Sequence, residues 1–498
     1  MWTWTLPLAI AAVAFAPGLA GQFVQDDRVV ILGNRVVTGE IPWWHAFTTT
    51  FWGRPFDAPP PAYRPIAILI YRLEWSCFGA SPFAFHVGSL LWYLAAVHVA
   101  HRVARQWTSV AAACMAASLF ACLPVHVENV TSLVGRADII ALLASSSVLL
   151  VLFPSGRARP TPMRVATAAM LYLTALLAKE SAAPVPAIVF LLAQWGSPRV
   201  EHRHHATMAL VVVGAAYTVA HGLLLPSTFT NDYVPDDVLA GATWWQRVSV
   251  SCWLVLEYVR ILAVPSDLCT GRKYAEVCLP QGSELAWSAL GMVFVSAIAW
   301  QCVHAIRTQR PPWLACALLA WMPFSALLFS PPELIADRFL LAPSFYVCVW
   351  VGTILASWPK LVRRTITGVW VVFQSSACMV YATMWYDDLA LLTHAVVACP
   401  DSVHNHVRLA YEYASRGNPE EAAWHMAVAS EGRRHFPHVW SHPAALAEQD
   451  TPVEQRLAHA HALLEIDIPE ATWRMQLAKY LAGQGLHEAA VLVLPTSH

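Results

Sequence analysis

The chain has 498 residues, of which 57% are hydrophobic and only 13% are charged. So few charges cannot cover the surface of a soluble protein of this length, and the composition therefore predicts a polytopic membrane protein. The 31 basic and 32 acidic residues give a formal net charge of −1, which argues against nucleic-acid binding through a basic surface.

Eleven apolar stretches are long enough, or nearly so, to cross a bilayer as an α-helix, which takes about 20 residues. In chain order they are residues 3–20, 83–101, 108–124, 137–153, 165–178, 181–195, 206–225, 285–304, 313–330, 339–357 and 365–384. Lys179 and Glu180 interrupt one apolar run between the fifth and sixth stretches, which predicts two short spans joined by a tight polar turn. No basic residue precedes the first stretch, so we expect a retained helix there and not a cleaved signal peptide.

The arginines in the short loops predict the orientation of the spans. Basic residues gather at 102–107, 154–164, 196–205, 307–310 and 360–364, and we expect these segments on the cytoplasmic side. The remaining loops then lie outside, including the long ones at 21–82 and 226–284, together with everything after residue 385.

Residues 248–264 are also apolar, but they contain Glu257 and Arg260, which are costly inside lipid. We interpret this segment as re-entrant or interfacial, which gives eleven spans and an outside C-terminus. A twelfth span is the alternative, and it would move Arg307 and Arg310 to the outside, against the charge rule.

The character of the chain changes after about residue 385. Residues 403–429 predict a helix, a Gly-Asn-Pro turn and a second helix, and residues 472–494 repeat this scheme at an offset of 68 positions. That offset is twice the period of tetratricopeptide repeats, about 34 residues. We therefore expect a membrane domain over residues 1–385 and a short tetratricopeptide-like domain over residues 386–498.

Charged residues collect in the loops that are predicted to lie outside. Asp26 and Asp27 directly follow the first span, where adjacent carboxylates suit general-base catalysis or metal binding, and where a helix cap is the simpler explanation. Further candidates in the later outer loops are His126, Glu128, Arg136, Asp138, Lys179, Glu180 and Arg338. Some of these would form ion pairs at helix ends. Together they suit an enzyme that takes a lipid phosphate from the bilayer, with cations on the phosphate and a carboxylate that deprotonates the attacking hydroxyl.

Five blocks of sequence occur in a characteristic order. They are FVQDD at 23–27, FWG at 51–53 with YRP at 63–65, PVHVE at 124–128 with GRAD at 135–138, AKE at 178–180, and DRFLLAPS at 337–344. In this order they resemble the tetratricopeptide-containing transmembrane O-mannosyltransferases, the cadherin-targeting type and its bacterial relatives. The resemblance implies an all-α polytopic membrane protein with a class C glycosyltransferase fold, a bundle of about 11 transmembrane helices followed by the repeat domain.

The resemblance also implies a reaction. It would transfer a sugar, most often mannose, from a polyprenyl-phosphate donor to a Ser or Thr hydroxyl of a protein, with inversion at the anomeric carbon. By position Asp26 would be the base, with Asp27 as second choice. As hypotheses, Arg64, Arg136, Lys179 and Arg338 would contact the donor phosphate or position the substrates, and His126, Glu128, Asp138 and Glu180 would lie on the acceptor side.

The expected partners are the lipid-linked donor, membrane lipid and a protein acceptor that the C-terminal repeats recruit. The expected place is a bacterial inner membrane with the site on the periplasmic face, or the lumenal face of the endoplasmic reticulum in a eukaryote. The sequence predicts no metal site and no cofactor other than the donor, and it leaves dependence on a divalent cation open.

Two features leave the acceptor open. Leu123 stands where the family usually has His, and the repeat array is short. A lipid or polysaccharide acceptor is the alternative for the same donor, and a non-catalytic scaffold that displays the repeats is the alternative to an enzyme. Cys269 and Cys278 fall in one outer loop, where a disulfide between them is compatible with an oxidising compartment.

Overall fold

The computed structural model describes residues 4–58, 62–154, 161–194, 203–225, 239, 242–271, 283–308, 310–327, 333–400, 402–418, 421–422 and 425. Within these residues the secondary structure is helical and includes no strand. The expected second repeat at 472–494 and Cys278 lie outside the described residues.

The N-terminal half begins with α1 and passes through the first outer loop into a set of long helices. The elements up to the second outer loop are α1 (Thr5–Phe15), η1 (Ala16–Ala20), η2 (Arg28–Leu32), α2 (Arg35–Thr38), η3 (Trp43–Phe47), α3 (Pro65–Phe78), α4 (Pro82–Trp107), α5 (Val110–Ala121), η4 (Pro124–His126), α6 (Val127–Thr131) and η5 (Leu133–Gly135). Those that follow are α7 (Arg136–Leu152), α8 (Pro162–Ala178), η6 (Glu180–Ala182), α9 (Val185–Ala193) and α10 (Arg203–Leu224).

The C-terminal half continues with helices of mixed length. These are α11 (Trp244–Ala263), α12 (Ser283–Arg307), α13 (Trp313–Trp321), η10 (Met322–Phe324), η11 (Asp337–Leu340), α14 (Leu341–Ala356), α15 (Lys360–Met384), α16 (Asp388–Ala398) and α17 (Val403–Ser415).

The predicted fold class, an all-α polytopic membrane protein, is confirmed. Six helices of the described chain are long and apolar enough to cross a membrane, and the bent pair of α5 with residues 124–131 makes a seventh. The other four expected spans coincide with shorter apolar helices, at Thr5–Ala20, Pro162–Ala178, Glu180–Ala193 and Trp313–Phe324. Lys179 and Glu180 separate α8 from α9, as the interrupted apolar run predicted.

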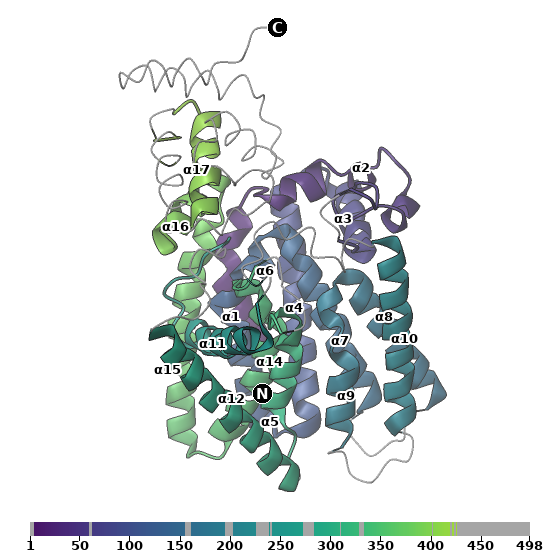
Figure 1. Cartoon of the computed structure of the whole chain (residues 1–498), viewed down its shortest axis with the longest axis vertical. Coiled ribbons are helices and arrows are strands. Elements are labelled where there is room, and N and C mark those ends of the chain that lie inside the picture. The colour runs from purple at the N-terminus through teal and green to yellow at the C-terminus, as the bar shows by residue number, and fades with distance from the viewer. Residues whose placement is uncertain are drawn as a thin grey trace.

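The segment that we expected to be re-entrant or interfacial is one continuous helix, α11. It begins with a capping box in which the Thr243 and Gln246 side chains bond each other's backbone N–H groups. Near its other end Arg260 pairs with Glu257 (2.6 Å) and Asp267 (2.7 Å), so each charge has a partner. In Figure 1 α11 crosses the direction of α4, α7 and α10. The choice between a re-entrant or interfacial segment and a twelfth span stays a prediction.

Small residues let the central helices pack closely. α14 lies against α5, and a Cβ added to Gly352 would stand 2.7 Å from the carbonyl oxygen of Ala112 and 3.0 Å from the Cβ of Ala116. Glycine and alanine at such contacts allow two backbones to approach within a membrane, where packing drives helix association.

The first outer loop and the C-terminal helices share one face of the bundle. Figure 1 shows α2, α3, α16 and α17 together at one end of the long helices. The contact is direct: the backbone N–H of Gln22 donates to the carbonyl of Tyr386 (2.7 Å), and Arg28 pairs with Asp388 (2.6 Å). The sequence prediction that both lie on the same side of the membrane agrees with this arrangement.

Candidate active site

Asp27 is fully buried at the junction of the first two outer loops. Its carboxylate accepts hydrogen bonds from the backbone N–H groups of Val24 (3.3 Å) and Val134 (2.9 Å). Burial raises the pKa of Asp27 to about 7, although the backbone donors act in the opposite direction. Asp27 therefore ties the two loops together, and its oxygen atoms face the protein.

Asp26 has the opposite environment. It is exposed, and among the described residues its carboxylate forms no hydrogen bond or ion pair. The preceding residue, Gln25, has a left-handed backbone with φ of +48°, which is uncommon for a residue other than glycine. The Asp388 side chain accepts a hydrogen bond from the Gln25 backbone N–H (2.8 Å). The Arg408 side chain donates to the side-chain oxygen of Gln25 (3.0 Å), so residues of two C-terminal helices fix this turn.

Six of the predicted site residues come together in a cluster of ion pairs beside the bundle. Arg64 bonds both oxygens of Glu180 (2.8 and 3.3 Å), and Lys179 pairs with Asp138 (2.6 Å). Arg338 pairs with Glu128 and donates its backbone N–H to the same carboxylate (3.2 Å). The charges of Asp138 and Arg338 also act on Arg64, so the pairs form one electrostatic unit.

A small, largely apolar groove with a free volume of about 40 Å³ lies beside this cluster, between α7, α9, α13 and α14. Its walls carry residues such as Leu142, Ile188 and Tyr346, while Asp138 and Arg338 stand among the lining residues. The site thus combines a small apolar groove with charged groups at one place on its wall. A ligand with a long hydrocarbon chain and an anionic head would satisfy both.

His126 and Glu128 bind protein groups. His126 is fully buried and bridges α4 to α14, with ring nitrogens 2.8 Å from the Tyr93 hydroxyl and 2.9 Å from the Ser344 hydroxyl. Glu128 is also buried and orients Arg338. The acceptor-side roles that we assigned to them stay predictions.

Arg136 binds partners that do not belong to the cluster. Its side chain is wholly buried and pairs with Glu74, while it donates to the Ser89 hydroxyl (3.0 Å) and the Phe85 carbonyl (2.6 Å). Its guanidinium also lies over the ring of Tyr71, 5.2 Å from the centroid. These contacts join α3, α4 and α7 and favour a structural role, and a role in phosphate binding stays a prediction.

Sequence reasoning did not select several residues that complete the site. Glu333 pairs with Arg338 (2.6 Å), and Gln25, Asp388 and Arg408 hold the turn before Asp26. Glu333 lies five positions before Arg338 in the same loop, a signal that was available. The partners of Gln25 are more than 360 positions away and carry no local signal.

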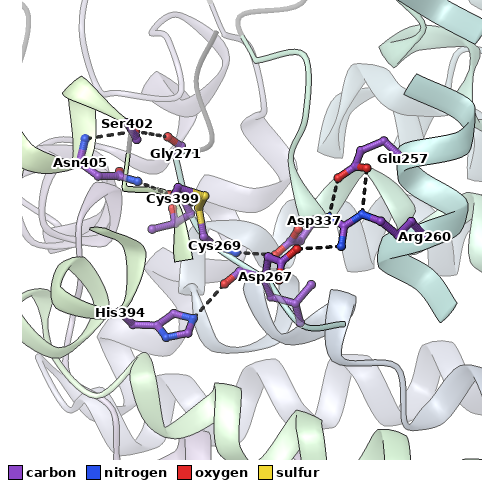
Figure 2. Close-up of a disulfide and its surroundings, with 12 residues drawn as sticks. Glu257, Arg260, Asp267, Cys269, Gly271, Asp337, His394, Cys399, Ser402 and Asn405 are labelled. Atoms are coloured by element: carbon purple, nitrogen blue, oxygen red, sulfur yellow. Dashed lines mark hydrogen bonds and ion pairs between the residues drawn. A yellow bond between two sulfur atoms is a disulfide. The ribbon is translucent and has the colours of Figure 1, made fainter. Parts of the chain in front are cut away.

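The disulfide differs from the one considered from the sequence, because Cys269 is bonded to Cys399 and not to Cys278. Figure 2 shows the segment that follows α11 fastened to α16 and α17 by this bond. His394 bonds the Leu268 carbonyl (2.9 Å), and the Asn405 side chain donates to the Thr270 carbonyl (3.1 Å). The chain folds back over 130 positions to bring Cys399 here, so proximity in sequence pointed to the wrong partner.

The disulfide also lies next to the ion-pair cluster. The backbone N–H of Cys269 donates to the carboxylate of Asp337 (3.1 Å), the residue before Arg338.

Among the described residues no three His, Cys, Asp or Glu side chains converge as ligands of a metal ion would.

The described chain is thus a polytopic helical membrane protein with a charged cluster at one face. No family model matches it. Its sequence is similar to curated protein O-mannosyl-transferases, which confirms the resemblance seen in the ordered sequence blocks. Tmtc2 of Drosophila melanogaster is 31% identical over 274 residues, 52% of this chain and 29% of the relative.

Other relatives match over more of the chain at lower identity. TMTC1 of Homo sapiens is 23% identical and the match covers 84% of this chain and 54% of that protein. F38B6.6 of Caenorhabditis elegans is 21% identical, with 83% and 60% covered. The chain therefore spans less than two thirds of the length of these relatives.

Two solved structures have a similar course of the chain. ArnT from Cupriavidus metallidurans bound to undecaprenyl phosphate has 12% identity and a TM-score of 0.41, with 87% of this chain and 88% of that chain covered. AglB from Archaeoglobus fulgidus, in complex with an inhibitory peptide and a dolichol-phosphate, has 12% identity and a TM-score of 0.46, with 90% and 61% covered.

Proposed function

We propose that this chain is a membrane glycosyltransferase that moves mannose from a polyprenyl-phosphate donor to a Ser or Thr hydroxyl of a protein. The observation that carries the proposal is the apolar groove lined at one point by Asp138 and Arg338, members of the ion-pair cluster. The ordered sequence blocks and the relatives named protein O-mannosyl-transferases support it.

The cluster would hold the phosphate of the donor, and its first isoprene units would lie along the apolar wall of the groove, which would have to widen to admit them. Arg64, Lys179 and Arg338 are the cations there, each kept in place by a carboxylate. When the bond between C1 of mannose and the phosphate oxygen breaks, its electron pair stays on the phosphate, which gains negative charge. Fixed cations stabilise that developing charge at little reorganisation cost.

Asp26 is the base in this proposal. Its exposed carboxylate would take the proton of the acceptor hydroxyl while the hydroxyl oxygen attacks C1 of mannose, opposite the departing phosphate. A single displacement of this kind inverts the configuration at C1. Asp27 stays the second choice, because backbone donors already occupy its buried carboxylate.

The acceptor is assigned from the relatives, and the C-terminal repeats would recruit it. The active face would be the periplasmic side of a bacterial inner membrane, or the lumenal side in a eukaryote. Asp138 and Glu180 would guide the acceptor indirectly, through the cations they hold. A lipid or polysaccharide acceptor for the same donor is the competing outcome.

The test is transfer of radiolabelled mannose from a polyprenyl-phosphate donor by membranes that contain the protein. We expect Asp26→Asn to lower the transfer rate by about 100-fold or more, the usual contribution of a general base. Asp57→Asn is the matched control, because Asp57 is another exposed aspartate of the first loop. Fractionation of the labelled product into protein and lipid names the acceptor class.

Three results would contradict parts of the proposal. Loss with Asp27→Asn and not with Asp26→Asn would reassign the base. Label in the lipid fraction alone would replace the acceptor. No transfer by folded wild-type protein with any lipid-linked sugar would favour the non-catalytic scaffold.

A further inference from the structure

A hollow with cationic walls lies at the other end of the bundle from the candidate active site. α4 has 26 residues, so its ends are about 39 Å apart, which is close to the thickness of a bilayer with its headgroups. The first outer loop contacts the beginning of α4, where Phe23 packs against Phe85. The hollow, of about 460 Å³, is formed near the end of α4 by the adjacent ends of α1, α5 and α7.

The wall that α4 provides is positively charged, and none of the described residues that line the hollow is acidic. Arg102 and Arg105 line the hollow and are exposed, and Arg105 donates to the backbone carbonyl of Thr108 (3.3 Å). The sequence has no Asp or Glu between Glu74 and Glu128, so α4 and α5 contribute no carboxylate. The positive charges of Arg102 and Arg105 are therefore available to an anionic ligand.

Buried polar atoms in the same wall lack partners. His101 is only 5% exposed, and neither of its ring nitrogens has a hydrogen-bond partner within the described part of the chain. The buried side-chain oxygen of Gln106 lacks a partner there as well. Buried polar groups in native proteins are nearly always hydrogen-bonded, so each such atom calls for an explanation. A ligand that accepts from a histidine N–H and donates a hydroxyl to the Gln106 oxygen would satisfy them.

The surroundings indicate where that ligand comes from. Trp4 lines the hollow, is about half-exposed and contacts the ring of His98 edge-on at 5.9 Å. Partly solvent-exposed tryptophans are enriched at the headgroup level of a bilayer, where they anchor membrane proteins. Basic pockets between membrane-spanning helices bind acidic lipid headgroups.

We propose that this hollow binds the headgroup of an anionic phospholipid that carries hydroxyl groups, such as phosphatidylglycerol. Its phosphate would lie between Arg102, Arg105 and His101, and a headgroup hydroxyl would donate to Gln106. The site is separate from the proposed transfer reaction and does not depend on it.

The test measures lipid binding to the purified full chain in detergent by native mass spectrometry. The probes are phosphatidylglycerol, phosphatidylcholine and inorganic phosphate. We expect phosphatidylglycerol to bind at least tenfold more tightly than phosphatidylcholine. Arg102→Gln with Arg105→Gln should weaken its binding by about 30-fold, roughly fivefold for each arginine near an anionic headgroup.

Two further variants separate a built site from general surface charge. His101→Phe keeps an aromatic ring and every formal charge at neutral pH while it removes both nitrogens. We expect binding about tenfold weaker or more, the usual effect of one lost hydrogen bond to a charged group. Arg307→Gln with Arg364→Gln removes the same charge from exposed positions outside the hollow and should change binding less than twofold.

The proposal is overturned if the control pair weakens binding as much as the Arg102 and Arg105 pair does. Equal affinity for phosphatidylcholine would also overturn it. Displacement of the lipid by inorganic phosphate at the same concentration would show a site for free phosphate in its place. A gel-filtration profile like that of the wild type is required of each variant.

Discussion

At the scale of single residues, the adjacent aspartates of the first loop show how far a sequence pattern reaches. In the sequence FVQDD, Asp26 and Asp27 cannot be told apart, because both directly follow the first span. In the structure the left-handed turn at Gln25 leaves the Asp26 side chain in solvent. The backbone N–H groups of Val24 and Val134 hold the Asp27 side chain inside the protein. The Val134 donor comes from another loop, so spacing within the first loop could not assign the two roles.

The buried aspartate predicts a dependence of stability on pH. The pKa of Asp27 is raised from 3.8 to about 7 in the folded protein, so the unfolded chain releases this proton at lower pH than the native state. Between these values the native state binds more protons, and the contribution of Asp27 to stability falls as pH rises. Asparagine does not titrate, so the melting temperature of Asp27→Asn relative to wild type should increase from pH 5 to pH 8.

Thermal unfolding in detergent at several pH values measures this difference. Asp57→Asn, at an exposed position, should differ from wild type by an amount that does not change over the same range. A difference for Asp27→Asn that stays constant with pH would show that Asp27 is ionised in the folded protein throughout.

At the scale of elements, local patterns and long-range contacts differ in what the sequence reveals. Apolar length placed the expected spans on helices, and the break at Lys179 and Glu180 placed a turn, because both depend on adjacent residues. The ion pairs depend on tertiary structure: Arg338 and Glu128 are 210 positions apart. The sequence identified the charged residues of the cluster but could not pair them.

The disulfide between Cys269 and Cys399 predicts a stabilising link between α16 and the segment after α11. Closing a loop of 130 positions restricts the unfolded chain, and such links typically contribute about 2–4 kcal/mol. We expect Cys399→Ser to lower the melting temperature, and a reductant to lower that of wild type to the same value. Cys77→Ser, at an exposed free cysteine, is the control and should melt like wild type. A wild-type melting temperature insensitive to the reductant, with the thiols shown to be free, would contradict the link.

At the scale of the whole molecule, the C-terminal helices are part of the candidate active site. Asp388 at the start of α16 pairs with Arg28 (2.6 Å) and accepts from the Gln25 backbone, on either side of Asp26. Arg408 on α17 reaches the Gln25 side chain. If Asp26 is the base, the position of its carboxylate depends on helices that follow the last membrane span. A repeat domain that recruits the acceptor would then also set the geometry of the base.

This coupling predicts that Asp388→Asn lowers kcat about tenfold with little change in KM for the donor, because a displaced base slows the transfer step without loosening the lipid groove. The control is Asp387→Asn, which removes the same charge from the neighbouring position. Asp387 caps α16 and pairs with Arg416 (3.0 Å) instead of the first loop, so the kcat of this variant should stay near that of wild type. Steady-state transfer kinetics of both variants measure the difference. An equal loss of kcat in the two variants would mean that both substitutions act by destabilising α16. A raised KM for the donor with an unchanged kcat in Asp388→Asn would mean that Asp388 affects donor binding and not the position of Asp26.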